Sequence, residues 1–356
     1  MSDILLPKFA VPRRWVHGGA VLIRPASGIG SHVVGDPCIV RDPSVGGYRM
    51  FLFLYPPGHG QSICRSLTDV GPGQWSAPLP LEFTNPEVIP EGTHKPYIVQ
   101  EAHRPNEAAC IGGRYSLVSV GMGKSKDIHQ AWATALAGPW TWDEQPLLSG
   151  GGPGSFDEKH TDAVSAFYFP QRGEILYCYM GYPRQAQPRA VSPFGNAQGV
   201  AIGRVGEPGV RKLGQVLPPC QTKGHWAAGW VGGLQILPGV KSRWVGLINA
   251  SPTAPDPANK AVWTEEPPPS LGGFAMCDAE FPVDGWRWCD APLERIEDIP
   301  AAAQAAGEGG NLWRHHILIL PDGGVAMFYN AGHYGQEQLY VKFAVGGGKE
   351  RTRPPV

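Results

Sequence analysis

The chain repeats one pattern of short strands five times, and this repetition constrains its fold more than any other feature of the sequence. Each copy begins with a polar residue and an apolar strand, followed by a turn, a strand rich in Tyr, Phe or Trp, and a third strand. Repeats of this kind are typical of β-propeller blades, which bury their faces only by packing against one another. The five copies occupy residues 35–81, 94–148, 161–217, 230–293 and 311–345.

The fifth copy is one strand short, which indicates how the ring closes. A propeller leaves no open edge when a strand from one end of the chain completes the blade formed by the other end. The apolar N-terminal segment 18–25 can supply that strand, and segment 296–310 is expected to form a short helix between blades four and five. We therefore predict an all-β fold, a five-bladed propeller of four-stranded antiparallel blades, in a single domain over residues 1–356.

Composition and charge exclude several classes of function. The formal net charge is −1 with both signs interspersed, so nothing resembles the basic surface that nucleic acids require, and we expect no nucleic-acid partner. No run approaches the roughly 18 apolar residues of a membrane-spanning helix. The N-terminal segment lacks the features of a signal peptide, so we expect a cytoplasmic protein without a membrane partner. The seven cysteines form no CxxC motif and are expected to be free thiols, most of them buried.

Polar residues at the starts of the inner strands are the best candidates for a site. In a propeller these strands line one central channel, so their starts converge whatever their separation in the sequence. Two carboxylates, cations and aromatic rings around one pocket suit a sugar, because acids move protons and rings stack on its apolar face. Counting back from each turn gives, as equivalent positions, Asp36, Lys95, Asp162, Trp230 or Val231, and Arg314 or His315.

Several of these segments resemble a known superfamily. The segment Gly35–Ile39 with the following strand YRMFLFLY is similar to the blade-one motif of the five-bladed glycoside hydrolases, which include family 43, family 117 and the invertase-like fructosidases. The segments GPW at 138–140 and HHILILPDGGVAMFYN at 315–330 also resemble parts of their second and last blades. The resemblance implies that Asp36 is the general base or nucleophile. It also implies that Asp162, in HTDAVSAFYF, orients the acid and tunes its pKa.

The chain departs from that superfamily at the proton donor. Family-43-like enzymes carry a catalytic Glu at the start of blade four, and the corresponding stretch 222–237 contains no carboxylate. Family 117 uses a histidine in this role, so His225 is one substitute, and Glu308 is another. The last blade of the superfamily implies a His near the axis beside a buried ion or water. We therefore expect no required cofactor, but a Ca²⁺ or other cation near the axis, with His316 as its ligand.

Further side chains at the strand starts are expected to bind the substrate. Asp36 and Asp162 could instead cap turns, and the histidines could be structural. The aromatic candidates lie close to strand starts, whereas the other tryptophans fall mostly on outer strands and are expected to pack between blades. The expected substrate-binding residues are His94, Lys95, Trp226, Trp230, Trp313, Arg314 and His315.

The sequence leaves three functions open. The leading hypothesis is a glycoside hydrolase that acts on a small or terminal sugar, with a small-molecule carbohydrate as its partner. A phosphorylase or transferase of the same fold would need cations for phosphate. A non-catalytic propeller that binds a glycan or a protein is the third alternative, and the oligomeric state is left open. Lys95, Arg104, Arg184, Arg189 and Arg314 are the residues that could bind phosphate.

Overall fold

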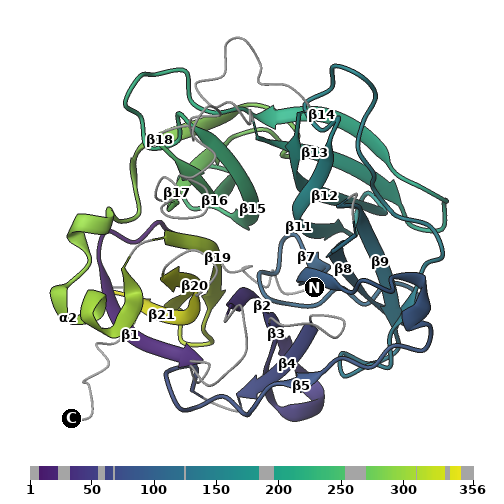
Figure 1. The fold of residues 1–356 in the computed structure, drawn as a ribbon, viewed down its shortest axis with the longest axis horizontal. Coiled ribbons are helices and arrows are strands. Elements are labelled where there is room, and N and C mark those ends of the chain that lie inside the picture. The colour runs from purple at the N-terminus through teal and green to yellow at the C-terminus, as the bar shows by residue number, and fades with distance from the viewer. Residues whose placement is uncertain are drawn as a thin grey trace, which may run out of the picture.

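Five small antiparallel sheets surround a common centre, as the sequence predicts (Figure 1). The structure is a computed structural model that describes residues 8–22, 33–54, 61–66, 69–123, 126–183, 196–252, 270–309, 311–332 and 337–345. Each sheet is a blade whose first strand lies nearest the axis and whose last strand lies at the rim. The inner strands, one from each blade, are β2 (Val34–Asp42), β6 (Thr93–Ile98), β11 (His160–Phe169), β15 (Trp230–Pro238) and β19 (Asn311–Ile319).

The remaining strands follow their inner strand outwards in sequence order, with exceptions in the third and fifth blades. In the third blade, the short strand β7 (Gln100–Glu101) pairs with β11 in parallel and makes a fifth strand. Blade one continues with β3 (Gly47–Leu54), β4 (Gln61–Ser66) and β5 (Leu79–Pro80), and blade two with β8 (Tyr115–Gly121), β9 (Ile128–Ala133) and β10 (Thr141–Trp142). Blade three continues with β12 (Glu174–Tyr182), β13 (Ala197–Arg204) and β14 (Arg211–Leu217). Blade four continues with β16 (Trp244–Ser251), β17 (Leu271–Cys277) and β18 (Trp286–Pro292).

The fifth blade joins the two ends of the chain. It contains β19, β20 (Val325–Gly332), β21 (Gln338–Ala344) and the N-terminal strand β1 (Trp15–Leu22), which pairs antiparallel with β21. The closing strand thus begins three residues before the predicted segment 18–25 and includes its residues 18–22, and residues 23–25 lie outside the described residues. Between blades four and five, the segment predicted to be helical forms three short turns: η3 (Ile296–Asp298), α2 (Ala301–Ala303) and η4 (Gln304–Glu308).

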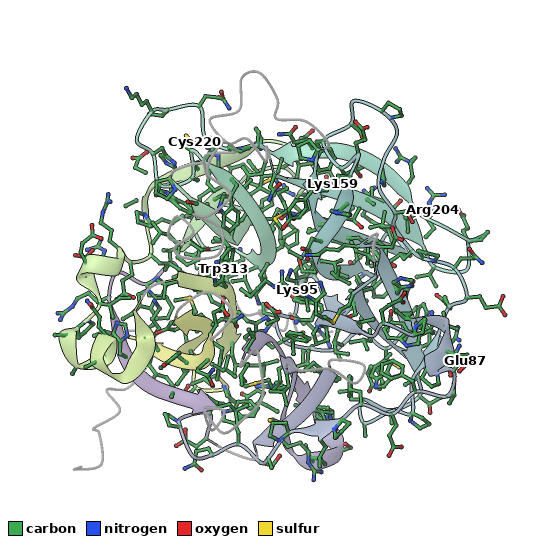
Figure 2. The ribbon with its side chains drawn as sticks, in the orientation of Figure 1. Glu87, Lys95, Lys159, Arg204, Cys220 and Trp313 are labelled. Carbon is green, nitrogen blue, oxygen red and sulfur yellow. The ribbon has the colours of Figure 1, made fainter. Side chains whose placement is uncertain are left out.

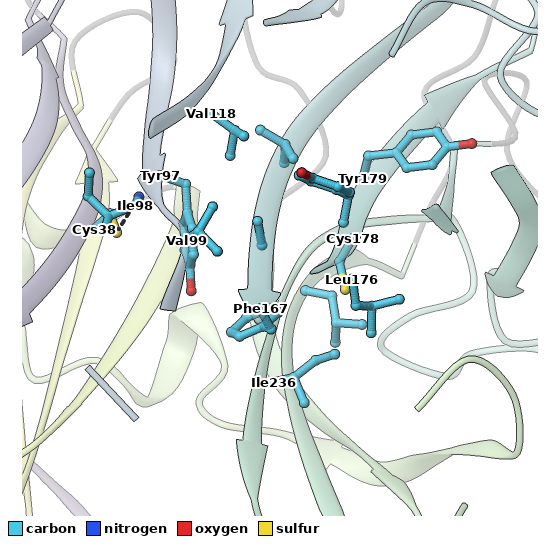
Figure 3. Close-up of a cluster of buried hydrophobic side chains, with 14 of the residues drawn as sticks. Cys38, Tyr97, Ile98, Val99, Val118, Phe167, Leu176, Cys178, Tyr179 and Ile236 are labelled. Atoms are coloured by element: carbon cyan, nitrogen blue, oxygen red, sulfur yellow. Dashed lines mark hydrogen bonds between the residues drawn. The ribbon is translucent and has the colours of Figure 1, made fainter. Parts of the chain in front are cut away.

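The apolar core lies between the blades. Figure 3 shows one cluster of this core, in which Tyr97 and Ile98 of the inner strand of blade two, with Val99 directly after it, lie beside Phe167 of blade three. The tryptophans of blade two fit the expected inter-blade role, because Trp140 and Trp142 are buried and Trp140 meets the ring of Phe51 of blade one edge-on. Four of the seven cysteines are buried free thiols, and within the described ranges no helix is long and apolar enough to span a bilayer.

A buried ion network holds the closing seam of blade five. His17 of β1 contacts Glu308 through Nδ1 at 2.6 Å and Glu294 through Nε2 at 2.8 Å. Lys342 of β21 is fully buried and lies 3.0 Å from the second oxygen of Glu294, while the Tyr329 hydroxyl donates to Glu308. The hydrogen bonds that His17 donates to Glu294 and Glu308 raise its pKa to about 9, against the opposing effect of burial. The network thus links β1, β20, β21 and the turns before β19.

The seam should weaken in mild alkali. His17 has a folded-state pKa of about 9 and an ordinary value of 6.5. Its contribution is therefore complete below pH 6.5 and is lost as the pH rises through about 9. The melting temperature should fall over this interval in the wild type, and His17→Gln should flatten the fall. His103→Gln is the control, because burial lowers the pKa of His103 and keeps it neutral in this window. An unchanged slope in His17→Gln would contradict this role.

Candidate active site

Each of the five inner strands carries one extra residue near its start. The pairing with the second strand skips a residue at the same place in every blade: between Gly35 and Cys38 in blade one, for example, and between His94 and Tyr97 in blade two. The backbone there is left-handed, a conformation that L-residues rarely adopt. Such bulges bend a strand and re-aim its side chains. The left-handed residues are Asp36 (φ 56°), Lys95 (φ 56°), Ala163 (φ 47°), Gly233 (φ 76°) and Arg314 (φ 46°).

The bulges correct the predicted equivalence of the strand starts. Asp36, Lys95 and Arg314 do occupy matching positions, but in blade three the matching residue is Ala163, and Asp162 precedes it. In blade four it is Gly233, rather than Trp230 or Val231. Counting back from the turn could not align these positions, because the number of residues between the bulge and the end of the strand differs among the inner strands.

Asp162 is a fully buried carboxylate held between two lysines. Its Oδ1 lies 2.6 Å from Nζ of Lys95, and its Oδ2 lies 3.1 Å from Nζ of Lys126. The backbone nitrogen of Ala163 also donates to Oδ1 at 2.6 Å, and the Tyr182 hydroxyl donates to Oδ2 at 3.5 Å. Burial alone would raise the pKa of Asp162, but the charges of Lys126 and Lys95 hold it well below its ordinary value. Asp162 is therefore ionised.

Asp36 has a different environment. Its Oδ1 accepts a hydrogen bond from Nδ2 of Asn330 at 3.3 Å, and Nε of Arg314 lies 3.8 Å away. The Asn330 side chain fits there because Gly35 has no Cβ; a Cβ would lie 2.2 Å from that side chain. Burial raises the pKa of Asp36, and the charges of Lys95 and Arg314 offset this only in part. Lys95 acts on both carboxylates, so the two form one electrostatic unit with different pKa values.

Aromatic and apolar side chains from blades three, four and five lie beside this unit. The rings of Trp230 and Trp313 stack at 5.1 Å with an interplanar angle of 19°. Met180 and Tyr182 of β12 pack in the same cluster with Ala163, the residue next to Asp162. In Figure 2, Trp313 and Lys95 lie near the centre of the ring, whereas Glu87 and Arg204 lie at its outside. The arrangement offers an apolar surface next to paired charges, as sugar recognition requires.

Three histidines predicted for the site lie on the inner strands, where His315 and His316 are buried and His94 is partly buried. His94 precedes Lys95 and meets the ring of Phe53 at 5.8 Å, and burial holds the pKa of His94 well below its ordinary value. His315 stacks on Tyr329 at 5.5 Å, with its Nδ1 at 2.9 Å from Nδ2 of Asn249. Burial likewise keeps the pKa of His315 well below its ordinary value, so both rings are neutral at physiological pH.

His316 points away from His315, towards blade one. Its Nε2 lies 3.2 Å from both the backbone nitrogen and the backbone oxygen of Ile39, and 3.3 Å from Nδ2 of Asn106. Burial lowers the pKa of His316 to about 3, so the ring is neutral. Among the described residues, no group of three or more His, Cys, Asp and Glu side chains is arranged to hold a metal. A cation near the axis stays a prediction, with one His316 nitrogen already engaged by the protein.

The two predicted proton donors and one predicted aromatic contact lie elsewhere. His225 and Trp226 both reach the backbone oxygen of Cys289 in β18, the outermost strand of blade four, at 3.2 Å and 2.8 Å. The loop that precedes β15 starts from the rim, so these residues pack there before the chain enters the channel. Glu308 is bound to His17 in the seam of blade five. The structure therefore does not bring these three residues to Asp36 and Asp162.

Sequence reasoning missed three residues of the site. Lys126 comes from the connection between β8 and β9, and Tyr182 and Asn330 come from the ends of second strands. The sequence could have indicated Tyr182 and Asn330. A second strand runs back towards the channel mouth, so its last residues lie beside the start of the first strand. The lysine of a connecting loop carried no comparable signal.

The comparisons with known proteins agree with this architecture. No family model matches the sequence, and neither does any curated protein. Among solved structures, a thermostable family-43 glycoside hydrolase is similar with a TM-score of 0.59 and 13% identity, over 93% of this chain and 98% of that one. The chain therefore has the fold of this glycoside hydrolase. The catalytic domain of a family-62 α-L-arabinofuranosidase from Coprinopsis cinerea matches with a TM-score of 0.58 and 10% identity, over 94% and 98% of the chains. An endo-1,4-β-xylanase from Bacteroides thetaiotaomicron matches with a TM-score of 0.55 and 12% identity, over 87% and 90%.

The strain at the bulges can be measured at Ala163, which holds a left-handed backbone without contributing a polar group. A side chain in this conformation costs roughly 1 to 2 kcal/mol, and glycine avoids that cost. Ala163→Gly should leave the free energy of unfolding unchanged or raise it by up to about 1 kcal/mol, after the loss of one buried methyl group. Ala166→Gly, in the regular part of β11, should lower it by about 1 kcal/mol. Urea denaturation checks both, and equal losses in the two variants would show that position 163 is unstrained.

Proposed function

We propose that the protein is a glycoside hydrolase that acts on a small or terminal sugar residue in the central channel. The observation that carries this proposal is the pair of buried carboxylates, Asp36 and Asp162, whose surroundings move their pKa values in opposite directions. Pairs of this kind divide acid–base work in enzymes. The stacked Trp230 and Trp313 beside them, and a fold shared with solved glycoside hydrolases, support the same chemistry.

Asp36 is the group that moves a proton to or from water. A raised pKa makes its carboxylate a stronger base, which suits activation of a water molecule at the anomeric carbon. Asn330 holds Asp36 in place through two hydrogen bonds. The backbone nitrogen of Asp36 donates to Oδ1 of Asn330 at 2.7 Å, and Nδ2 of Asn330 donates to Oδ1 of Asp36 at 3.3 Å. Asp162 remains ionised throughout and positions Lys95.

Lys95 is the proton donor in this proposal, in place of the missing glutamate. It lies between the two carboxylates, and burial lowers the pKa of its ammonium group, which brings it closer to the range useful for proton transfer. The ammonium passes a proton to the glycosidic oxygen as that bond breaks, while Asp36 takes one from the attacking water. Transfer of that proton from Asp36 back to Lys95 then restores both groups.

Removal of the base should abolish turnover without unfolding the protein. Turnover of a panel of aryl arabinofuranosides, xylosides, galactosides and fructosides identifies the working substrate. On that substrate, Asp36→Asn should lower kcat by at least about 100-fold, the smallest usual effect of a general base. Asp278→Asn, which changes an exposed aspartate paired with Arg287, should leave kcat unchanged. Normal turnover in Asp36→Asn with an unchanged melting temperature would refute the proposed role.

Substrates whose leaving groups differ in acidity distinguish the role of the proton donor, Lys95, from that of the base, Asp36. Lys95→Met should slow the release of poor leaving groups much more than that of dinitrophenol, which departs without a proton, whereas Asp36→Asn should slow both. Turnover that depends on inorganic phosphate would favour a phosphorylase instead. Binding of sugars without cleavage of any glycoside would favour the non-catalytic alternative and overturn the hydrolase proposal.

A further inference from the structure

Three cations gather around the two carboxylates. Lys95 and Lys126 contact Asp162 at 2.6 Å and 3.1 Å, and Arg314 lies 3.8 Å from Asp36, while the neighbouring His94 is neutral. Cationic groups that gather at one place attract ligands of opposite charge.

The cations also lie closer to solvent than the carboxylates that they surround. The Lys126 side chain is 37% exposed, Lys95 17% and Arg314 11%, whereas Asp162 is 0% exposed and Asp36 8%. A ligand that enters the channel thus meets ammonium and guanidinium groups before it meets a carboxylate. This order disfavours a cationic ligand and favours an anionic one.

Lys126 and Arg314 are placed to reach such a ligand from two sides. Lys126 comes from blade two and lies over the ring of Tyr182, at 5.9 Å. Arg314 comes from blade five, where Nη2 donates to the backbone oxygen of Val164 at 3.2 Å and so holds the guanidinium across the start of blade three. The absence of a Cβ at Gly233 leaves room for this group, because a Cβ there would lie 3.0 Å from Nη1 of Arg314.

We propose that the channel holds a subsite for an oxyanion group, bound by Lys126 and Arg314 next to the sugar ring. The group is a carboxylate, sulfate or phosphate carried by the sugar, or free inorganic phosphate that joins it. Guanidinium and ammonium groups bind such oxygens through strong charge-assisted hydrogen bonds. The adjacent Trp230 and Trp313 cover the apolar part of the same ligand. This inference names the substrate class of the proposed glycosidase site and rests on that proposal for its sugar component.

Calorimetric binding tests the subsite without requiring turnover. The ligands are D-glucuronate and D-galacturonate, each matched with the neutral D-glucose and D-galactose, together with glucose 6-sulfate, glucose 6-phosphate and inorganic phosphate. One anionic ligand at least should bind about tenfold more tightly than its neutral counterpart, the gain expected from one charge-assisted hydrogen bond. Tight binding of charged sugars assigns the oxyanion to the substrate. Tight binding of inorganic phosphate alone assigns it to a second reactant.

Variants identify the cation that binds the oxyanion group. Lys126→Gln keeps a hydrogen-bonding side chain without the charge and should reduce the preference for the anionic ligand at least about fivefold. Lys241→Gln removes an exposed lysine from the turn between β15 and β16 and should leave the preference unchanged. Equal binding of anionic and neutral ligands by the wild type would overturn the subsite, and so would an undiminished preference in Lys126→Gln. Anion binding without cleavage of any glycoside would refute the hydrolase and leave the subsite standing.

Discussion

The extra residue at the start of every inner strand is the constraint on which the rest of the site depends. It forces a left-handed backbone at five equivalent places, and four of the five residues there are not glycine. Each of these four costs roughly 1 to 2 kcal/mol, a strain that the surrounding sheets must hold in place. The strained backbone sets the direction of the side chains. Asp36, Lys95 and Arg314 therefore belong to one electrostatic unit although they come from blades one, two and five.

Burial then makes these groups different from one another. Asp162 lies between two ammonium groups and keeps its charge, whereas burial makes Asp36 hold its proton more readily, despite a guanidinium nitrogen at 3.8 Å and an amide at 3.3 Å. Neither property belongs to an aspartate in water. Each follows from which blade supplies the neighbouring residue, so the ring of blades determines the acid–base character of the site as well as its shape.

Much of the fold could be predicted from the sequence because its signals are local. Strand length, turn residues and the missing strand of the fifth copy are readable within each repeat, and the structure has the five blades that they predict. The site was predictable only in part. The starts of the inner strands were enough to predict Asp36, Lys95 and Arg314. The choice between Asp162 and Ala163, one residue apart, depends on how β11 pairs with β12. The contacts of Lys126, His225 and Glu308 depend on where loops pack, and no local pattern encodes that packing.

The central claim is that two aspartates from different blades form one unit with opposed pKa shifts. Carbon-13 NMR titration of the aspartate carboxyl groups tests it most directly, with Asp36→Asn and Asp162→Asn used to assign the two signals. Asp36 should titrate above the ordinary value of 3.8, and Asp162 should remain ionised well below it. In Asp162→Asn, the pKa of Asp36 should also fall, because a negative charge nearby has been removed. Two ordinary, independent titrations would contradict the account.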